Sequence, residues 1–209
     1  MRTLIFLAVC AVSGVASQFT ANGQAAILNV HNTLRSNIAK GSYVAKGLTK
    51  PAGTNILKVS WDTDLAASAQ AHADKCTFDH SDSANIGENI YIYATSGNIA
   101  SIDQYGSAAS AMWEREFQDY GWKSNFLGSD LSKSGILHAT QMAWAKTNSI
   151  GCGVKNCAKT INSAYNTVVV VCQYKAQGNI LNQNIYTPGA TCSACPSGTK
   201  CDKDSGLCV

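Results

Sequence analysis

Charged residues are scarce in this chain, and glutamate is rare among them. Only 14% of the 209 residues are charged, and the formal net charge at pH 7 is +3. This balance excludes a disordered polyelectrolyte and a strongly basic nucleic-acid-binding protein. The three glutamates, Glu88, Glu114 and Glu116, all fall in one short stretch of the sequence. Because glutamates ordinarily scatter over a protein surface, this grouping is the first indication of a site.

Long apolar runs are missing beyond the first seventeen residues. Met1 and Arg2 give a positive start, an apolar stretch too short to cross a bilayer follows, and residues 15–17 (Val-Ala-Ser) resemble a cleavage site. This arrangement predicts a secretory signal peptide over residues 1–17. No later segment reaches the roughly 20 apolar residues that a transmembrane helix needs. We therefore expect a secreted, extracellular protein with no transmembrane segment.

Cysteine, by contrast, is abundant. Nine cysteines in so short a chain indicate an oxidising compartment. Removal of residues 1–17 would take away Cys10 and leave eight, which can pair as four disulfides. Four of them lie in a tail, residues 187–209, that has almost no large apolar side chain and must be cross-linked. We expect a signal peptide (1–17), a globular domain (18–186) and this cysteine-rich tail (187–209).

Hydrophobic periodicity places helices before strands in the globular domain. Thr20 with Gln24 is a loose start signal for a first helix, whose apolar residues then recur at helical spacing from 27 to 38. Asp62 or Thr63 can cap a second helix that runs to residue 76, and a third is expected over 103–120. Runs rich in β-branched and aromatic residues predict strands at 90–94 and 168–174, with a shorter candidate at 150–154. Without βαβ alternation, this order predicts an α+β fold in which helices and a sheet form a sandwich.

Two histidines and two glutamates are the candidate site residues. Glu116 follows Trp113 by three positions, so it projects from the inward side of its helix, and a buried carboxylate needs a partner. His80 and His138 are the natural partners, and Glu88 follows closely after His80. Together they could hold a divalent metal such as zinc through the imidazoles, with a carboxylate positioning water. The alternative for the four residues is a purely structural hydrogen-bond network.

Two further histidines lie among residues expected to pack. His31 shares a helix face with Ile27, Leu34 and Ile38, and His72 lies among alanines. For both, a buried histidine bonded locally is the expected role, rather than a metal ligand.

Six short segments form a recognisable combination. They are residues 31–35 (HNTLR), 87–91 (GENIY), 113–116 (WERE), 138–144 (HATQMAW), 151–154 (GCGV) and 172–179 (CQYKAQGN). In this order they resemble the signature set of the CAP superfamily, which includes cysteine-rich secretory proteins, venom antigen 5 and plant pathogenesis-related proteins. The chain is most similar to secreted nematode members, the venom-allergen-like or SCP-like extracellular proteins, and its tail resembles the family's cysteine-rich hinge.

The resemblance implies an α-β-α sandwich, the CAP fold, with an open cleft lined by His80, Glu88, Glu116 and His138. Known members bind zinc or other divalent ions in this cleft, and several bind sterols or fatty acids at separate apolar sites. No general enzymatic activity is established for the family. The resemblance therefore implies a non-enzymatic extracellular binding, signalling or defence module with a protein or lipid ligand, which needs no metal to fold. The implied disulfides are Cys76–Cys152, Cys157–Cys172, Cys192–Cys201 and Cys195–Cys208.

One departure from the family pattern falls beside the cleft. The family usually has an aromatic residue after the cleft histidine, where this chain has Ala139. We expect this substitution to shorten one wall of the cleft.

A zinc-dependent hydrolase that uses the same cleft is the alternative function. In that reading His80 and His138 hold a metal that activates water, and Glu116 or Glu88 acts as the base. The chain has no His-Glu-X-X-His helix and no Gly-X-Ser-X-Gly turn, so the hydrolase stays second to a binding module.

Overall fold

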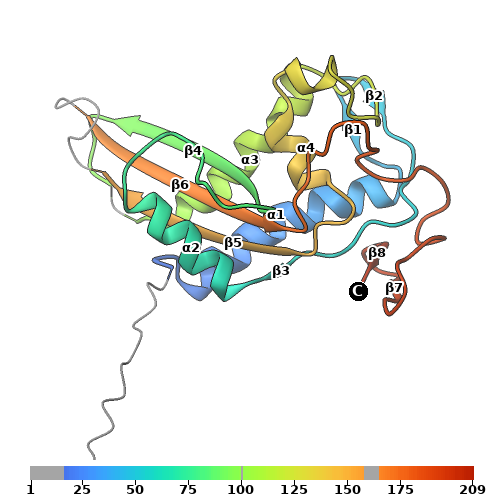
Figure 1. The fold of residues 1–209 in the computed structure, drawn as a ribbon, viewed down its shortest axis with the longest axis horizontal. Helices are drawn as coiled ribbons and strands as arrows, with labels where there is room; N and C mark the ends of the chain where they lie inside the picture. The colour runs from blue at the N-terminus through green and yellow to red at the C-terminus, as the bar shows by residue number, and fades with distance from the viewer. Residues whose placement is uncertain (1–16, 100, 158–164) are drawn as a thin grey trace, which may run out of the picture.

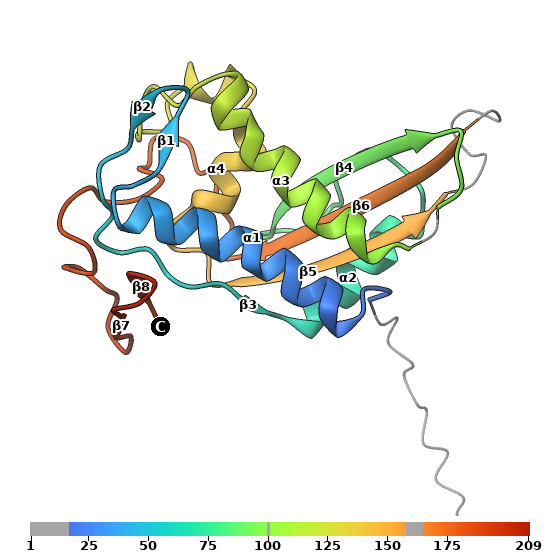
Figure 2. The same ribbon diagram turned by 180° about the vertical axis from the view of Figure 1, so that it is seen from behind.

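A four-stranded sheet lies between two helical layers in the computed structural model, which describes residues 17–99, 101–157 and 165–209. One helix, α2, covers one face of the sheet, and α1, α3 and α4 lie on the other (Figures 1 and 2). The helices are α1 (Ala21–Ala39), α2 (Thr63–Ala73), α3 (Asp103–Asp119) and α4 (Leu137–Ala143), with a 3-10 turn η1 (Leu131–Lys133). The expected α+β class and α-β-α sandwich are confirmed. The predicted signal peptide lies outside the described residues, except for Ser17.

The helices begin where the sequence offers capping side chains. Thr20 accepts a hydrogen bond from the Gly23 backbone at the start of α1. Asp62 Oδ1 accepts from two backbone amides in the first turn of α2, at 2.9 and 3.0 Å. The three predicted helices are confirmed, but α4 was not expected. Five of its seven residues are buried, so it shows no alternation of apolar and polar faces for the sequence to reveal.

The strands of the sheet run in the order β3-β5-β6-β4. They are β3 (Ser60–Trp61), β4 (Gly87–Thr95), β5 (Ser149–Asn156) and β6 (Asn166–Lys175). β3 runs parallel to β5, whereas β6 is antiparallel to both β5 and β4. The predicted strands are confirmed and are longer than expected. Residues 167–174 of β6 are buried without alternation because helices cover both faces of this central strand.

The Gly-Cys-Gly sequence of β5 lets α2 lie directly on the sheet. A Cβ atom at Gly151 would come within 2.1 Å of the Ala66 backbone nitrogen, and one at Gly153 within 2.3 Å of the Gln70 Cα. Any side chain at either position would therefore collide with helix backbone. The two glycines set the close approach between α2 and the sheet.

The disulfides of the sheet differ from the expected pairs. Cys152 bonds to Cys172 and Cys76 bonds to Cys157, so the expected Cys76–Cys152 and Cys157–Cys172 pairs are wrong. The reason is strand register: Cys152 on β5 lies directly opposite Cys172 on β6, with Cα atoms 4.1 Å apart. Cys157 lies just beyond β5, within reach of Cys76 beyond α2.

The tail is cross-linked as expected and also packs on the sandwich. Its disulfides are Cys192–Cys201 and Cys195–Cys208, which confirms both expected pairs. They hold a small hairpin of β7 (Cys201–Asp202) and β8 (Leu207–Cys208), while a second small hairpin, β1 (Val44–Ala45) and β2 (Leu48–Thr49), follows α1. Cys208 exchanges backbone hydrogen bonds with Ile56 and Lys58, both at 2.9 Å, and Leu207 is fully buried.

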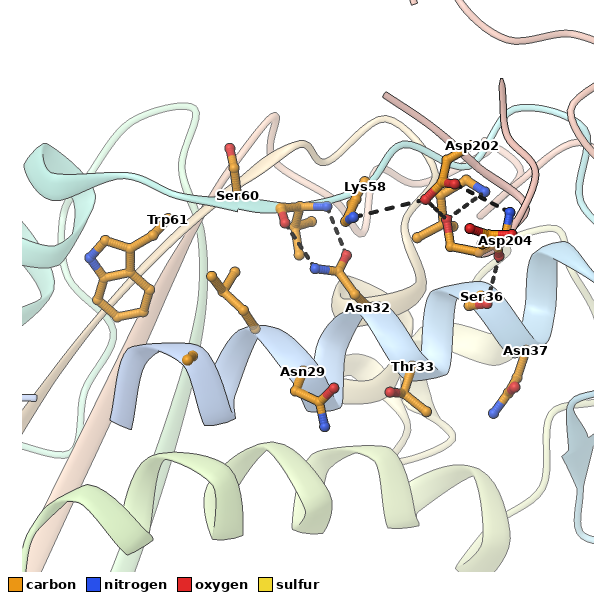
Figure 3. Close-up of a pocket in the computed structure, with 15 residues that line it drawn as sticks. Asn29, Asn32, Thr33, Ser36, Asn37, Lys58, Ser60, Trp61, Asp202 and Asp204 are labelled. Carbon is orange, nitrogen blue, oxygen red and sulfur yellow. Dashed lines mark hydrogen bonds and ion pairs between the residues drawn. The ribbon is translucent and has the colours of Figure 1, made fainter. Parts of the chain in front are cut away.

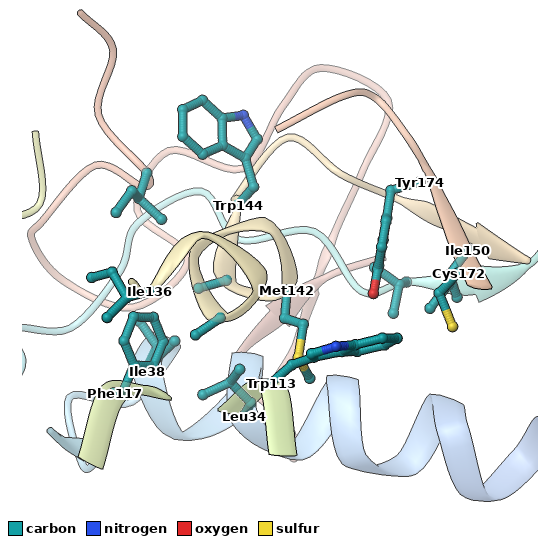
Figure 4. Close-up of a cluster of buried hydrophobic side chains, with 14 of the residues drawn as sticks. Leu34, Ile38, Trp113, Phe117, Ile136, Met142, Trp144, Ile150, Cys172 and Tyr174 are labelled. Atoms are coloured by element: carbon teal, nitrogen blue, oxygen red, sulfur yellow. The ribbon is translucent and has the colours of Figure 1, made fainter. Parts of the chain in front are cut away.

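The main core lies between α1, α3, α4 and the sheet. Figure 4 shows Leu34 of α1, Trp113 of α3 and Met142 of α4 around this space. Beside the core, Arg35 is completely buried, and no carboxylate among the described residues pairs with it. Its guanidinium instead donates five hydrogen bonds of 2.7 to 3.1 Å to backbone carbonyls, those of Leu57, Met142, Trp144, Ala145 and Thr147.

Candidate functional site

The first candidate pair is His80 with Glu88. His80 Nδ1 donates to Glu88 Oε1 at 3.0 Å, and the His80 side chain is 66% exposed whereas that of Glu88 is 6% exposed. Ser81 donates to the same carboxylate through its backbone nitrogen at 2.8 Å and its hydroxyl at 2.6 Å. Gln173, directly opposite Glu88 in the β4–β6 register, donates a fourth hydrogen bond at 2.9 Å. Glu88 is thus a buried acceptor surrounded by donors.

These donors decide the charge of Glu88. Burial by itself would raise the pKa of the Glu88 carboxyl, but the hydrogen bonds from Gln173, Ser81 and His80 outweigh burial and lower this pKa below its ordinary value. The carboxylate is therefore ionised at neutral pH. It holds the imidazole of His80 by a charge-assisted hydrogen bond.

The second pair is His138 with Glu116. Glu116 Oε1 lies 2.5 Å from His138 Nδ1, and its Oε2 accepts from the Ala139 backbone nitrogen at 3.1 Å. The His138 ring also stacks on Trp113, with ring centroids 6.1 Å apart. Glu116 thus projects inward from α3, as the sequence predicts, and it orients the first turn of α4.

Both pairs leave the same ring nitrogen free. In each pair a carboxylate accepts from Nδ1, so Nδ1 carries the proton and Nε2 keeps a lone pair. Among the residues that the structure describes, neither Nε2 has a hydrogen-bond partner. The side chains of His80 and His138 are 66% and 38% exposed, so both nitrogens are accessible to solvent species. A carboxylate that orients an imidazole in this way is a common arrangement behind metal-binding histidines.

The two pairs line neighbouring hollows. His80 and Glu88 line one of about 220 Å³ together with Gln141, and Glu116 and His138 line one of about 360 Å³. Helix α4 joins them, because it carries both His138 and Gln141. In the described part of the chain, these four residues supply no group of three ligand atoms within 4.8 Å of one another; the one such group is Cys192, Cys195 and Cys208, whose sulfurs are in disulfides.

A buried polar network lies behind α4. Asn89, next to Glu88, donates to the His138 carbonyl at 3.1 Å and to the Tyr174 hydroxyl at 3.2 Å. The same hydroxyl meets His31 Nε2 at 3.0 Å, and His31 Nδ1 donates to the Ile27 carbonyl at 2.9 Å. The expectation that His31 is a buried, locally bonded histidine is confirmed. His72 is also buried, with its Nε2 2.8 Å from the Asp79 carbonyl oxygen.

The supporting residues Ser81, Asn89, Gln141 and Gln173 were not among the sequence candidates. Asn89, Gln141 and Gln173 do lie inside the segments that carry the family resemblance, so those segments held a signal. What the sequence lacks is the pairing of β4 with β6, which brings Gln173 to Glu88.

One expectation about the site changes with the structure in hand. Ala139 is fully buried in the core, so its small side chain does not shorten the cleft wall as expected. Ser81 adjoins His80 in the sequence, but its hydroxyl donates to Glu88 and not to His80, so the two residues do not form a Ser–His pair of the kind that activates a nucleophile.

A larger cavity lies away from these pairs. It is an open groove of about 730 Å³ between α1, the segment around β3 and the tail. Figure 3 shows Asn32 and Ser36 of α1 facing Lys58 and the tail residues Asp202 and Asp204. The groove contains no histidine or glutamate, but Leu28, Val59, Trp61 and Leu207 give it an apolar lining.

Comparison with known proteins places this geometry in a family. Residues 28–174 match the model of the cysteine-rich secretory protein (CAP) family. The chain is 37% identical over 191 residues to the Ancylostoma secreted protein of Ancylostoma caninum, a match that covers 87% of this chain and 42% of that protein. It is 35% identical to venom allergen 5.02 of Dolichovespula maculata, a match that covers 77% of this chain and 74% of the allergen. The chain spans less than half the length of the first relatives that it matches.

Solved structures agree with the sequence matches. The structure of NaASP2 with Zn²⁺ superposes with a TM-score of 0.82 at 31% identity, covering 96% of this chain and all of that one. The structure of BmVAL-1 gives a TM-score of 0.83 at 34% identity, covering 92% of this chain and 96% of that one. Sequence and fold lead to one conclusion: the chain belongs to the CAP family of cysteine-rich secretory proteins.

Proposed function

We propose that the chain is a secreted, non-enzymatic CAP-domain protein that acts outside the cell as a binding module. In this proposal it binds a divalent metal ion, zinc in the first place, through His80 and His138. The observation that carries the metal proposal is the pair of imidazoles whose Nδ1 atoms are each held by a glutamate and whose Nε2 atoms are free. The solved relative NaASP2 was crystallised with Zn²⁺, which supports the same ion class.

In this proposal the four residues divide into ligands and supports. His80 and His138 would supply nitrogen ligands, and zinc bound there would act as a Lewis acid toward a further ligand. Glu88 and Glu116 orient the imidazoles and keep the ring proton on Nδ1. Glu88 already accepts four hydrogen bonds, so we assign it a supporting role and not that of a metal ligand. Two protein ligands are fewer than tight zinc sites have, so we expect modest affinity.

Secretion is supported by the chemistry of the whole chain. Four disulfides link eight cysteines in the described residues, which an oxidising compartment would preserve. The leader-like residues 1–17 fit export, and one relative is named a secreted protein. No helix in the described part of the chain is long and apolar enough to cross a membrane.

The hydrolase alternative finds less support. A general base needs a lone pair directed at the reacting water, but both glutamates already accept hydrogen bonds from their histidine and from backbone amides. Hydrolysis that EDTA abolishes, and that His80→Ala also abolishes, would establish the alternative and displace the binding proposal.

A lipid such as a sterol or fatty acid is the second candidate ligand, and the groove between α1 and the tail favours it. The half-buried Leu28 and Trp61 supply apolar surface there, and the buried Val59 and Leu207 lie beneath it. Mass spectrometry of solvent extracts from the purified protein tests this candidate. A bound lipid that Trp61→Ala releases would support it, and an extract free of lipid together with no saturable uptake would remove it.

Isothermal titration with zinc tests the metal proposal. We expect His80→Ala and His138→Ala each to weaken zinc binding at least tenfold, because each removes a ligand. Glu116→Gln should weaken it by about 10 to 100-fold through loss of orientation. Glu114→Gln is the matched control, since it lies on the same helix and does not contact His138. Zinc binding that is unchanged in both histidine variants would overturn the proposal.

A further inference from the structure

The chain is anchored immediately after the predicted cleavage point. Phe19 is buried, with 3% of its surface exposed, and the Thr20 backbone nitrogen donates to Asp103 Oδ1 at 2.9 Å. The Gln18 backbone nitrogen donates to Gln70 Oε1 at 3.0 Å, while Gln18 itself is exposed. A chain cut between Ser17 and Gln18 would therefore have its new terminus held against α2.

The acceptor for that terminus is fixed. Gln70 is fully buried, its Oε1 also accepts from the Val154 nitrogen at 3.0 Å, and its Nε2 donates to the Val154 carbonyl at 2.8 Å. Nε2 also donates to Asp74, whose carboxylate is paired with Lys155 at 3.0 Å. The Gln18 nitrogen thus meets one amide oxygen, and the nearby carboxylate is already neutralised.

This setting suits one N–H donor better than an ammonium group. In the uncleaved chain the Gln18 nitrogen is a peptide N–H, and its one hydrogen is donated to Gln70 Oε1. An α-ammonium would bring three donors and a charge to the same place. A lactam nitrogen keeps one N–H and no charge. The Gln18 side chain makes no hydrogen bond within the described residues, so it is free to fold back on its own nitrogen.

We propose that Gln18 becomes the N-terminal residue of the exported chain and cyclises to pyroglutamate, so that a neutral lactam N–H docks on Gln70. The α-amino nitrogen attacks the side-chain amide carbon Cδ, the new N–Cδ bond closes a five-membered ring, and the Cδ–Nε2 bond breaks. Ammonia leaves with the proton given up by the amine, so no oxidant or co-reactant is needed. This inference rests on the proposed secretion, because only removal of residues 1–17 exposes the amine.

Mass spectrometry of the exported protein tests the proposal. The full chain is produced in a eukaryotic secretory line, collected from fresh medium, and its N-terminal peptide is sequenced. We expect one terminus at residue 18, lighter by about 17 Da than the uncyclised peptide because ammonia is lost. Gln18→Asn is the control, because the shorter side chain would have to close a four-membered ring. It should give a terminus at the same position with its full mass.

The other possible results distinguish the cyclisation of Gln18 from the proposed secretion. A terminus at Gln18 with full mass overturns the cyclisation and leaves secretion standing. A terminus at any residue other than 18 in exported protein also overturns the cyclisation. Retention of the chain in the cells, with residues 1–17 still attached, overturns the proposed secretion and this inference together.

Discussion

Histidine occurs in two contrasting settings in this protein. His31 is buried and both its ring nitrogens are bonded within the fold, to the Ile27 carbonyl and the Tyr174 hydroxyl. His80 and His138 face solvent, and a glutamate satisfies only one ring nitrogen of each. Residue type alone therefore does not single out a candidate metal ligand. The candidates are the histidines with a ring nitrogen that has no partner among the described residues.

The same distinction between used and unused polar atoms applies to a buried side chain that carries a full charge. Arg35 has five N–H donors, as an arginine that binds a ligand would, yet all five donate to backbone carbonyls. Burial lowers the pKa of Arg35 to about 9, which still leaves the guanidinium charged at neutral pH. Arg35 therefore serves stability, whereas the Nε2 atoms of His80 and His138 are the groups that the proposed metal site would use.

The largest predicted effect concerns Arg35. Arg35→Met removes the donor from five buried carbonyls, and breaking a buried hydrogen-bond network of this kind is expected to lower the free energy of unfolding by about 4 kcal/mol. Arg35→Lys keeps the charge but has only three donors, so we expect an intermediate loss. Urea denaturation followed by circular dichroism measures both.

Arg115→Met is the matched control for Arg35. Arg115 is exposed and pairs with Asp119 one turn along α3, so its loss should cost less than about 1 kcal/mol. If Arg35→Met proves no more destabilising than Arg115→Met, the buried network is not a stabilising feature and the comparison fails.

Local sequence signals predicted much of the fold, whereas long-range register decided the rest. Helices α1 and α3 followed from apolar spacing, and Asp62 marked the start of α2. The pairing of Cys152 with Cys172 depends on the alignment of β5 with β6, which no local pattern encodes. The inward direction of Glu116 followed from helix periodicity, but the donors around Glu88 follow from strand pairing.

The second prediction uses acid to test the buried histidine. Burial lowers the pKa of His31 from 6.5 to about 4, so between these values the unfolded chain binds a proton that the folded chain does not. The contribution of His31 to stability is therefore complete above pH 6.5 and is lost as the pH falls toward 4. The loss amounts to about 3 kcal/mol, at 1.36 kcal/mol per pKa unit.

Unfolding free energies of His31→Gln across this pH range check the prediction. Relative to the wild type, the variant should lose about 3 kcal/mol less between pH 6.5 and 4, whatever its stability at neutral pH. Equal slopes in His31→Gln and the wild type would show that the buried imidazole does not titrate as its surroundings indicate.

The smallest effect tests the residue that connects the two settings. Asn89 bonds the Tyr174 hydroxyl of the buried network and the carbonyl of His138, so it fixes α4 against β4 between the two glutamate pairs. Asn89→Ala leaves the His138 carbonyl without this donor, which should cost about 2 kcal/mol. Because Glu116 still orients the His138 ring, zinc affinity should fall less than in His138→Ala. Asn166→Ala, which removes an exposed bond to Gly97, is the control for both measurements. A full loss of zinc binding in Asn89→Ala would mean that the position of α4, more than the glutamate behind the ring, presents the free nitrogen.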